Sequence, residues 1–285
     1  MSTTTTTRKR RRLEPVLVKV PEITFLFWVL KLLTTGMGEA MSDFLGQQSV
    51  PLAAFIGLAG IAVAVRLQLN RPAYSAPYYW FAVMMVAVFG TMAADGIHDG
   101  VGIGYDLTTP LFALVTAGIF LVWYRTEGTL SIHSITRRRR ERFYWAAVFA
   151  TFALGTAAGD LTAYQLNLGF WSSVVLFAIV IAIPAVTWAR GWMHPIAGFW
   201  FAYVVTRPLG ASFADGFSKP TNGGLNLGDG MVSAIAFVIF VALVAYVTIT
   251  KRDIQTPGEQ AEEPHPHHLR HPHLGAAPEA QAATD

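Results

Sequence analysis

Long apolar stretches recur along this chain, and they limit what it can fold into. Runs of about 18 or more mostly apolar residues are long enough to cross a membrane as helices. Because 53% of the 285 residues are hydrophobic and only 14% are charged, we expect an all-α, polytopic membrane protein rather than a soluble domain. The eight predicted spans cover residues 20–44, 50–69, 76–95, 108–124, 143–160, 170–189, 195–215 and 231–249.

Basic residues predict how these spans are oriented. With eight spans, the Lys and Arg residues of the connections fall on one side, and Lys219 alone falls on the other. Cytoplasmic loops are enriched in these residues, so we expect both termini in the cytoplasm and the protein in the bacterial cytoplasmic (inner) membrane, with the lipid bilayer as its partner. The basic runs at 8–12 and 137–142 are then orientation signals, and no nucleic-acid binding is expected.

Several functional classes lack their signatures in this sequence. There is no cysteine, which excludes disulfides and thiolate chemistry. The basic N-terminal region is not followed by a short apolar stretch with a small-residue cleavage site, so we expect no cleaved signal peptide. No zinc-protease, serine-hydrolase or phosphate-loop motif occurs, and we expect no enzymatic activity.

A motif repeats four times with fixed spacing, far beyond what chance would give. Each copy reads aromatic-Trp, nine residues, Gly, four residues, Asp. The motif residues are Trp28, Trp80, Trp145 and Trp200; Gly38, Gly90, Gly155 and Gly210; and Asp43, Asp95, Asp160 and Asp215. Each copy begins a unit of two helices, so all four motif helices run in the same direction.

The predicted organisation is four pseudo-symmetric two-helix repeats between two tails. The repeats cover residues 19–70, 71–126, 127–190, which includes a basic cytoplasmic linker, and 191–252. We expect the basic tail at 1–18 and the His-rich tail at 253–285 to be disordered in the cytoplasm.

This arrangement resembles the bacterial membrane proteins built from four tandem copies of a two-helix "repeat of unknown function", an uncharacterised family of membrane-anchored proteins. The resemblance covers about residues 19–250 and implies eight spans with a Trp in each repeat. It implies no particular substrate or reaction. The unequal linkers between units and the His-rich tail depart from the family pattern.

Polar side chains share a helical face with each motif Asp. Counting back from each Asp in steps of four residues gives the polar positions Glu39, Thr35, Lys31, Thr91, Thr156 and Arg207. A charge at the centre of a bilayer costs about 2.5 to 3.5 kcal/mol on insertion scales, so we expect the motif helices to enclose a shared polar interior. The motif Gly residues would let neighbouring helices approach closely, and the Trp residues are expected to be packing or interfacial anchors.

Two interpretations of the four Asp residues stay open. In one, they form an acidic ring at the outer mouth of a path lined by Glu39 and the Thr positions. Carboxylate and hydroxyl oxygens would suit Mg²⁺, Mn²⁺, Ca²⁺ or protons. In the other, each Asp caps a turn or bonds to loop backbone where its helix ends.

Lys31 and Arg207 would repel cations unless carboxylates neutralise them. An ion pair between Arg207 and Glu39 is sterically reasonable if the first and fourth motif helices adjoin. Such a pair could be static, or it could break and re-form during proton-coupled transport, with the two basic residues acting as gate or counter-charge. A further interpretation is that the two basic residues hold an anionic substrate.

Two groups of His residues are weak candidates for metal binding. His98 and Asp99 lie one turn beyond Asp95 and could supply metal ligands, although an ordinary polar loop is the favoured interpretation. The tail contains the other group, which could bind a metal loosely or be incidental low-complexity sequence: His265, His267, His268, His271 and His273.

These observations favour a transporter or channel for a small inorganic cation, either a divalent metal or a proton-coupled one. The sequence identifies no cofactor. A divalent metal, if bound, would be a substrate or a ligand of the tail. The rival hypothesis is a membrane sensor, scaffold or partner subunit that transports nothing and whose repeats only build a stable bundle.

Overall fold

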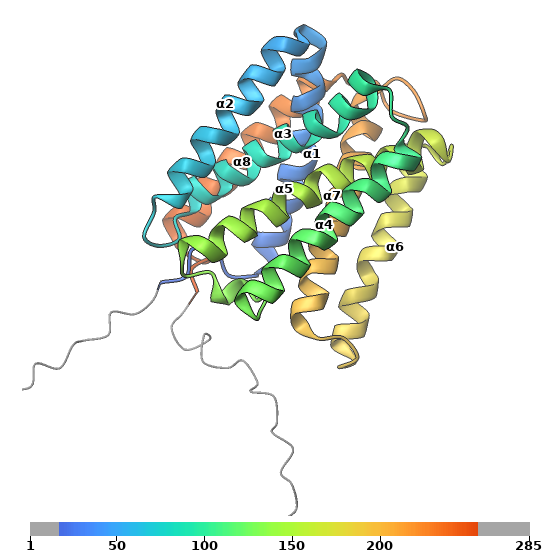
Figure 1. Cartoon of the computed structure of the whole chain (residues 1–285). Coiled ribbons are helices and arrows are strands. Elements are labelled where there is room, and N and C mark those ends of the chain that lie inside the picture. Colours follow the sequence, from blue (N-terminus) through green and yellow to red (C-terminus); the bar gives the residue numbers. More distant parts are fainter. Residues whose placement is uncertain (1–16, 256–285) are drawn as a thin grey trace, which may run out of the picture. The chain divides into compact units, whose positions relative to one another are not determined.

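The computed structural model describes residues 17–255, which contain eight α-helices joined by loops (Figure 1). Every predicted apolar run corresponds to one of them. A short 3-10 helix, η1 (Ile132–Ser134), precedes α5, and a π-helix, η2 (Leu161–Gln165), directly extends it. The α-helices are α1 (Phe25–Gln48), α2 (Val50–Leu69), α3 (Ala76–Val101), α4 (Tyr105–Glu127), α5 (Arg138–Asp160), α6 (Gly169–Ala189), α7 (Pro195–Ser218) and α8 (Asp229–Thr250).

Six of these helices are long and apolar enough to cross a membrane, which makes the chain a multi-pass membrane protein. They are α2, α3, α4, α5 with its π-helical extension, α6 and α8. Helices α1 and α7 are of similar length, but they carry charged residues in their interiors. Of the eight predicted spans, six are therefore supported by length and composition.

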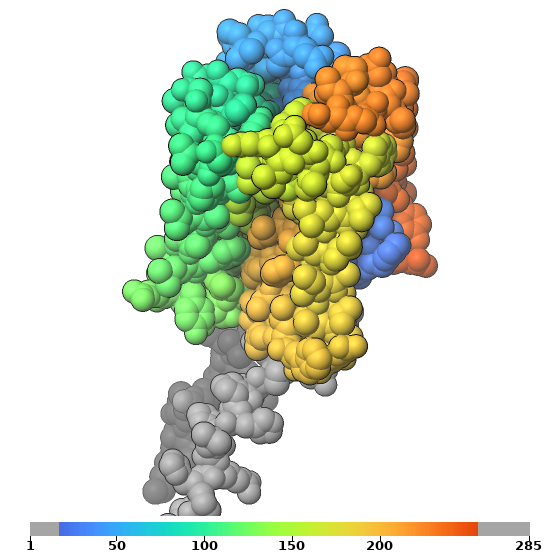
Figure 2. Space-filling view, turned by 90° about the vertical axis from the view of Figure 1, so that its right-hand side faces the viewer, coloured from blue at the N-terminus to red at the C-terminus, as the bar shows by residue number. Residues whose placement is uncertain are grey.

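The motif helices α1, α3, α5 and α7 form a closed inner ring. Each packs against the next, and α7 packs against α1. The second helix of each unit lies outside the ring and packs mainly on the motif helix of the following unit: α2 on α3, α4 on α5, α6 on α7 and α8 on α1. Figure 2 shows α4 (green) and α6 (yellow) on the outer surface. The four units are thus related by a cyclic pseudo-fourfold arrangement.

The motif glycines make the close contacts within this ring. Each one faces the residue three positions before the Gly of the next unit. A Cβ atom added to Gly38 would lie 2.5 Å from the Cβ of Ala87, and one added to Gly90 would lie 2.8 Å from the Cβ of Phe152. Gly155 faces Arg207 and Gly210 faces Thr35 in the same way. A side chain at any of these positions would push two inner helices apart.

The aromatic-Trp pairs close one end of the ring, and we call these eight residues the aromatic collar. The first aromatic residue of each unit packs on the Trp of the next, with ring centroids 5.6 to 6.1 Å apart. The four contacts are Phe27 with Trp80, Tyr79 with Trp145, Tyr144 with Trp200, and Phe199 with Trp28. Trp28 is partly exposed, whereas the other three Trp residues are buried.

The segment before α1 packs across the same end of the molecule. The Lys19 ammonium forms a buried ion pair with Glu141 of α5. The backbone amide of Glu22 donates a hydrogen bond of 2.9 Å to the carbonyl oxygen of Asp253. The buried Val18 and Asp253 were predicted to belong to disordered tails, so those boundaries were set too far inward. Residues 1–16 and 256–285 of the two predicted tails lie outside the described residues.

Candidate functional site

An acidic pocket opens at the other end of the ring, where the motif helices end. Its volume is about 360 Å³. Carboxylates dominate its walls, which consist of Glu39, Asp43, Asp95, His98, Asp99, Tyr105, Asp160, Tyr164, Asp215 and Lys219. All four motif Asp residues therefore line one cavity, together with Glu39.

The four Asp residues are withdrawn from solvent to different degrees. Asp160 and Asp215 are 6% and 3% exposed, and Asp43 and Asp95 are half-buried. Within the described residues, the Oδ1 atom of Asp215 has no hydrogen-bond partner. Asp160 is the last residue of α5 before the π-helix, and Tyr164 within that π-helix lines the pocket. Short π-helical segments often occur at functional sites.

Arg207 does not line the pocket itself, but it is fully buried and pairs with Glu39 of the pocket wall. Its Nη2 atom donates to the carboxylate of Glu39 at 2.8 Å and to the hydroxyl of Thr156 at 2.7 Å, and it also donates to the hydroxyl of Thr91. Its Nη1 atom donates to the carbonyl oxygen of Thr35 at 2.8 Å. The ion pair suggested by the sequence is therefore present, and its network joins all four inner helices.

Lys31 lies on the same face of α1 as Thr35, one turn further from the pocket, and is 1% exposed. Its Nζ atom is 4.0 Å from the ring centroid of Phe152 and 4.3 Å from that of Tyr203, and it lies 3.4 Å from the hydroxyl of Thr35. None of the ion pairs between residues 17 and 255 involves Lys31. Two aromatic faces surround this amine in place of a carboxylate.

Lys219 follows the last residue of α7 and brings a positive charge into the pocket. Its Nζ atom lies 2.5 Å from Oδ2 of Asp43 and 3.2 Å from Oδ2 of Asp229, the first residue of α8. Burial acts to lower the pKa of Lys219, but Asp43, Asp215 and Asp229 outweigh burial and raise that pKa. In the sequence, Lys219 stands out as the lone basic residue on its side of the membrane, but no motif there indicates a role for it.

His98 and Asp99 lie at the pocket, but the set of described carboxylates with metal-ligand spacing does not include them. The His98 ring stacks on Tyr105 with centroids 3.8 Å apart, and its Nδ1 atom is 2.9 Å from the carbonyl oxygen of Ile103. The Asp99 side chain is 80% exposed. The five His residues predicted as tail ligands lie outside the described residues.

The carboxylates of the pocket nevertheless offer one compact set of oxygen ligands. One carboxylate oxygen each from Glu39, Asp43 and Asp215 lies within 4.8 Å of the other two. Such oxygen ligands suit hard cations such as Mg²⁺, Mn²⁺ and Ca²⁺. Asp95 and Asp160 line the same pocket outside this set.

The fold and the pocket define the chain as a multi-pass helical membrane protein built from internal two-helix repeats around a charged centre. The family described as "Repeat of Unknown Function (DUF347)" matches residues 78–129, 143–191 and 198–253, more than half of the chain, and the chain belongs to this family. The resemblance indicated by the motif is thereby confirmed. No curated protein and no solved structure matches the chain.

The three family matches coincide with the second, third and fourth units of the ring. The first unit, α1 and α2, lies outside them. Its Trp28 and Gly38 make the same contacts in the ring as their counterparts, and its Asp43 lines the same pocket. The first unit is also the one that places Lys31 and Glu39 in the centre, which sets its sequence apart.

Proposed function

We propose that this protein is a carrier that moves a hard cation, either a divalent metal or a cation coupled to protons, through the centre of the ring. The observation that carries the proposal is that the four motif Asp residues and Glu39 line one cavity of about 360 Å³. If each Asp were only a helix-end cap, the four carboxylates would have no reason to meet. Repulsion between them is a cost that a bound cation would offset.

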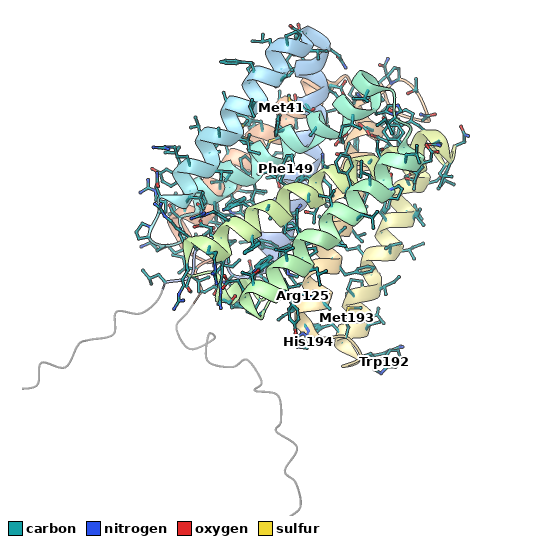
Figure 3. All side chains as sticks on the ribbon, viewed as in Figure 1. Met41, Arg125, Phe149, Trp192, Met193 and His194 are labelled. Atoms are coloured by element: carbon teal, nitrogen blue, oxygen red, sulfur yellow. The ribbon has the colours of Figure 1, made fainter. Side chains whose placement is uncertain are left out.

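In this proposal all eight helices cross the cytoplasmic membrane and the acidic pocket faces outward. The support is the distribution of basic residues. Arg125 lies at the end of α4, and Figure 3 shows it at the same end of the molecule as Trp192, Met193 and His194, away from Met41. The positive-inside rule assigns that end to the cytoplasm.

The packing below the pocket favours a carrier over an open channel. Arg207, Phe152 and Lys31 are all buried where the axis of the ring passes, and the aromatic collar follows them. A cation bound to Glu39 would compete with Arg207 for the same carboxylate. Release of Arg207 would therefore be the step that opens the path, with Arg207 and Lys31 acting as gate and counter-charge.

The rival function is a sensor, scaffold or partner subunit that transports nothing. The observation in its favour is that each of the three guanidinium nitrogens of Arg207 donates to a protein acceptor, which a static bundle would also need. An anionic substrate is a weaker candidate, because Arg207 already donates to protein acceptors and Lys31 lies beneath it. Catalysis is not part of the proposal.

Flux measurements on purified protein in liposomes test the proposal against its rival. We expect uptake of at least one of Mn²⁺, Mg²⁺, Zn²⁺ or H⁺, and its loss in the double variant Asp95→Asn, Asp160→Asn. The matched control is Asp106→Asn, an exposed carboxylate at the start of α4 that does not line the pocket. Absence of flux for every ion would overturn the proposal and favour the rival.

A further inference from the structure

We propose that Lys219 is a tethered competitor for a divalent-cation site formed by Glu39, Asp43 and Asp215. The inference rests on the proposed function and adds to it the class of ion and the residue that selects it. It begins from two observations at the acidic pocket: an acceptor without a donor, and an ammonium that already occupies one of the ligands.

Asp215 provides the acceptor. It is 3% exposed and lines the pocket, and its Oδ1 atom has no partner among the described residues. A buried carboxylate oxygen without a donor is costly, so a ligand that coordinates this oxygen would remove the cost. Oxygens of Glu39 and Asp43 lie within 4.8 Å of an oxygen of Asp215, close enough for one hard cation to bind all three.

Lys219 occupies one of these three ligands. Its Nζ atom is 2.5 Å from Oδ2 of Asp43. A metal ion bound to Asp43 would lie a few ångströms from this ammonium, and the two positive charges would repel each other strongly in a partly buried pocket. Cation binding and retention of Lys219 on Asp43 therefore exclude each other.

Asp229 gives Lys219 a second place to bind. Its Oδ2 atom is already 3.2 Å from the Lys219 ammonium, and Gln47 donates to the same oxygen at 2.6 Å. The Oδ1 atom of Asp229 has no partner between residues 17 and 255, and the residue is 6% exposed. Lys219 can thus move from Asp43 to Asp229 without losing a carboxylate partner.

The loop that carries Lys219 is fixed, so the exchange needs only a side-chain movement. The indole of Trp171 donates to the carbonyl oxygen of Gly223 at 3.0 Å, and the amide of Phe170 donates to that of Asn222 at 3.2 Å. Both bonds attach the loop between α7 and α8 to the start of α6. A long, flexible Lys side chain on a fixed backbone suits a reversible contact.

The movement of Lys219 between Asp43 and Asp229 favours divalent over monovalent cations at the site. A monovalent ion that displaces Lys219 replaces one positive charge by another, and it competes with an ammonium held at a high effective concentration by its tether. A divalent ion adds a positive charge to a site that contains three carboxylates, so it gains attraction that a monovalent ion does not. Lys219 would therefore keep the site free of monovalent cations.

Equilibrium binding of Mn²⁺ to the purified full chain in detergent, with and without added Na⁺, tests the inference. We expect Lys219→Met to bind Mn²⁺ at least about tenfold more tightly than the wild type, because the charged hydrogen bond to Asp43 no longer competes. Na⁺ should inhibit Mn²⁺ binding in this variant more than in the wild type. Asp229→Asn should bind Mn²⁺ several-fold more weakly, since Lys219 loses its alternative partner.

The controls separate this inference from the proposed function. Lys251→Met removes an exposed Lys at the C-terminal end of α8 and should leave Mn²⁺ binding unchanged, and Lys219→Arg should bind close to wild type. If the wild type binds Mn²⁺ and Lys219→Met binds it equally or more weakly, the competitor role is overturned while cation binding stands. If Lys219→Met does not fold, Asp229→Asn is the deciding variant. Mn²⁺ binding by Asp229→Asn that equals wild-type binding would then overturn the competitor role of Lys219. If no chain binds a divalent cation, the competitor role fails, and the flux measurements with H⁺ decide the proposed function separately.

Discussion

The two ends of the inner ring are built from the same four helices but are closed in opposite ways. At the aromatic collar, each unit contributes two large rings that contact the next unit, with centroids 5.6 to 6.1 Å apart. At the acidic pocket, each unit contributes one Asp, and a cavity of about 360 Å³ remains. The short Asp side chain cannot reach across the ring, whereas Trp and its aromatic neighbour can.

This difference separates packing from function within one motif. Within a membrane, helices associate through close packing rather than through the hydrophobic effect, and the collar supplies that packing. The pocket instead gathers carboxylates of like charge and leaves Oδ1 of Asp215 without a partner among the described residues. Features that cost stability without a local compensation are expected at functional sites. Substitutions at the two ends should therefore change stability in opposite directions.

The largest effect is expected at Arg207, which separates the two ends. Arg207→Met should lower the free energy of unfolding by about 3 to 5 kcal/mol, because it leaves the Glu39 carboxylate buried and without its cation. The measurement is the thermal or denaturant midpoint of the purified protein in detergent. The double variant Arg207→Met, Glu39→Met should recover much of the loss. Equal stability of the single variant and the wild type would show that the pair does not hold the ring together.

A smaller loss of about 3 kcal/mol is expected from Trp80→Ala in the aromatic collar. Trp80 is 1% exposed and contacts Phe27 and Tyr79, so its removal leaves a cavity that the ring cannot fill by a small shift. Trp192→Ala is the matched control, because Trp192 is 73% exposed and its loss should change stability by less than about 0.5 kcal/mol. If Trp80→Ala lowered stability no more than Trp192→Ala does, the aromatic collar would not be the packed end of the molecule.

The smallest effect should have the opposite sign. In buffer without divalent cations, Asp95→Asn should stabilise the protein by about 1 kcal/mol, because it removes one of several like charges that share the pocket. The same midpoint measurement applies, with Asp106→Asn as the control, since Asp106 is exposed and does not line the pocket. Added Mn²⁺ should stabilise the wild type more than this variant. A clear loss of stability in Asp95→Asn would instead support the helix-end cap interpretation.

Much of the architecture could be predicted from the sequence because it depends on length and spacing. The apolar runs predicted all eight helices, and the Trp, Gly and Asp positions follow from a repeat whose units must pack alike. The ion pair of Glu39 with Arg207 was suggested because both residues lie on the polar face of their helices. The repeat alone does not say whether its units form a ring or a row. The closure of α7 onto α1 was indicated only by the shared polar face and was a condition of the suggested ion pair.

Other features depend on contacts between segments far apart in the chain. Glu141 stands in a run of Arg residues that looked only like an orientation signal, yet it is fully buried against Lys19. Lys219 looked like an exception to the charge pattern, and only the fold places it beside Asp43. In both cases the sequence carried a signal, an acidic residue among basic ones and a lone basic residue, but it did not identify the partner.

The segment before α1 lies next to the segment after α8, because the backbone amide of Glu22 donates a hydrogen bond of 2.9 Å to the carbonyl oxygen of Asp253. The order of the units along the chain could therefore be changed. Helix α8 packs on α1 as α2 packs on α3, so the junction between the last and first units is structurally like the three that the chain covers continuously. A circularly permuted gene that starts before α3 and ends after α2, with a short linker joining Gln255 to Leu17, should give the same ring. The ring would then form whichever of its units came first along the chain.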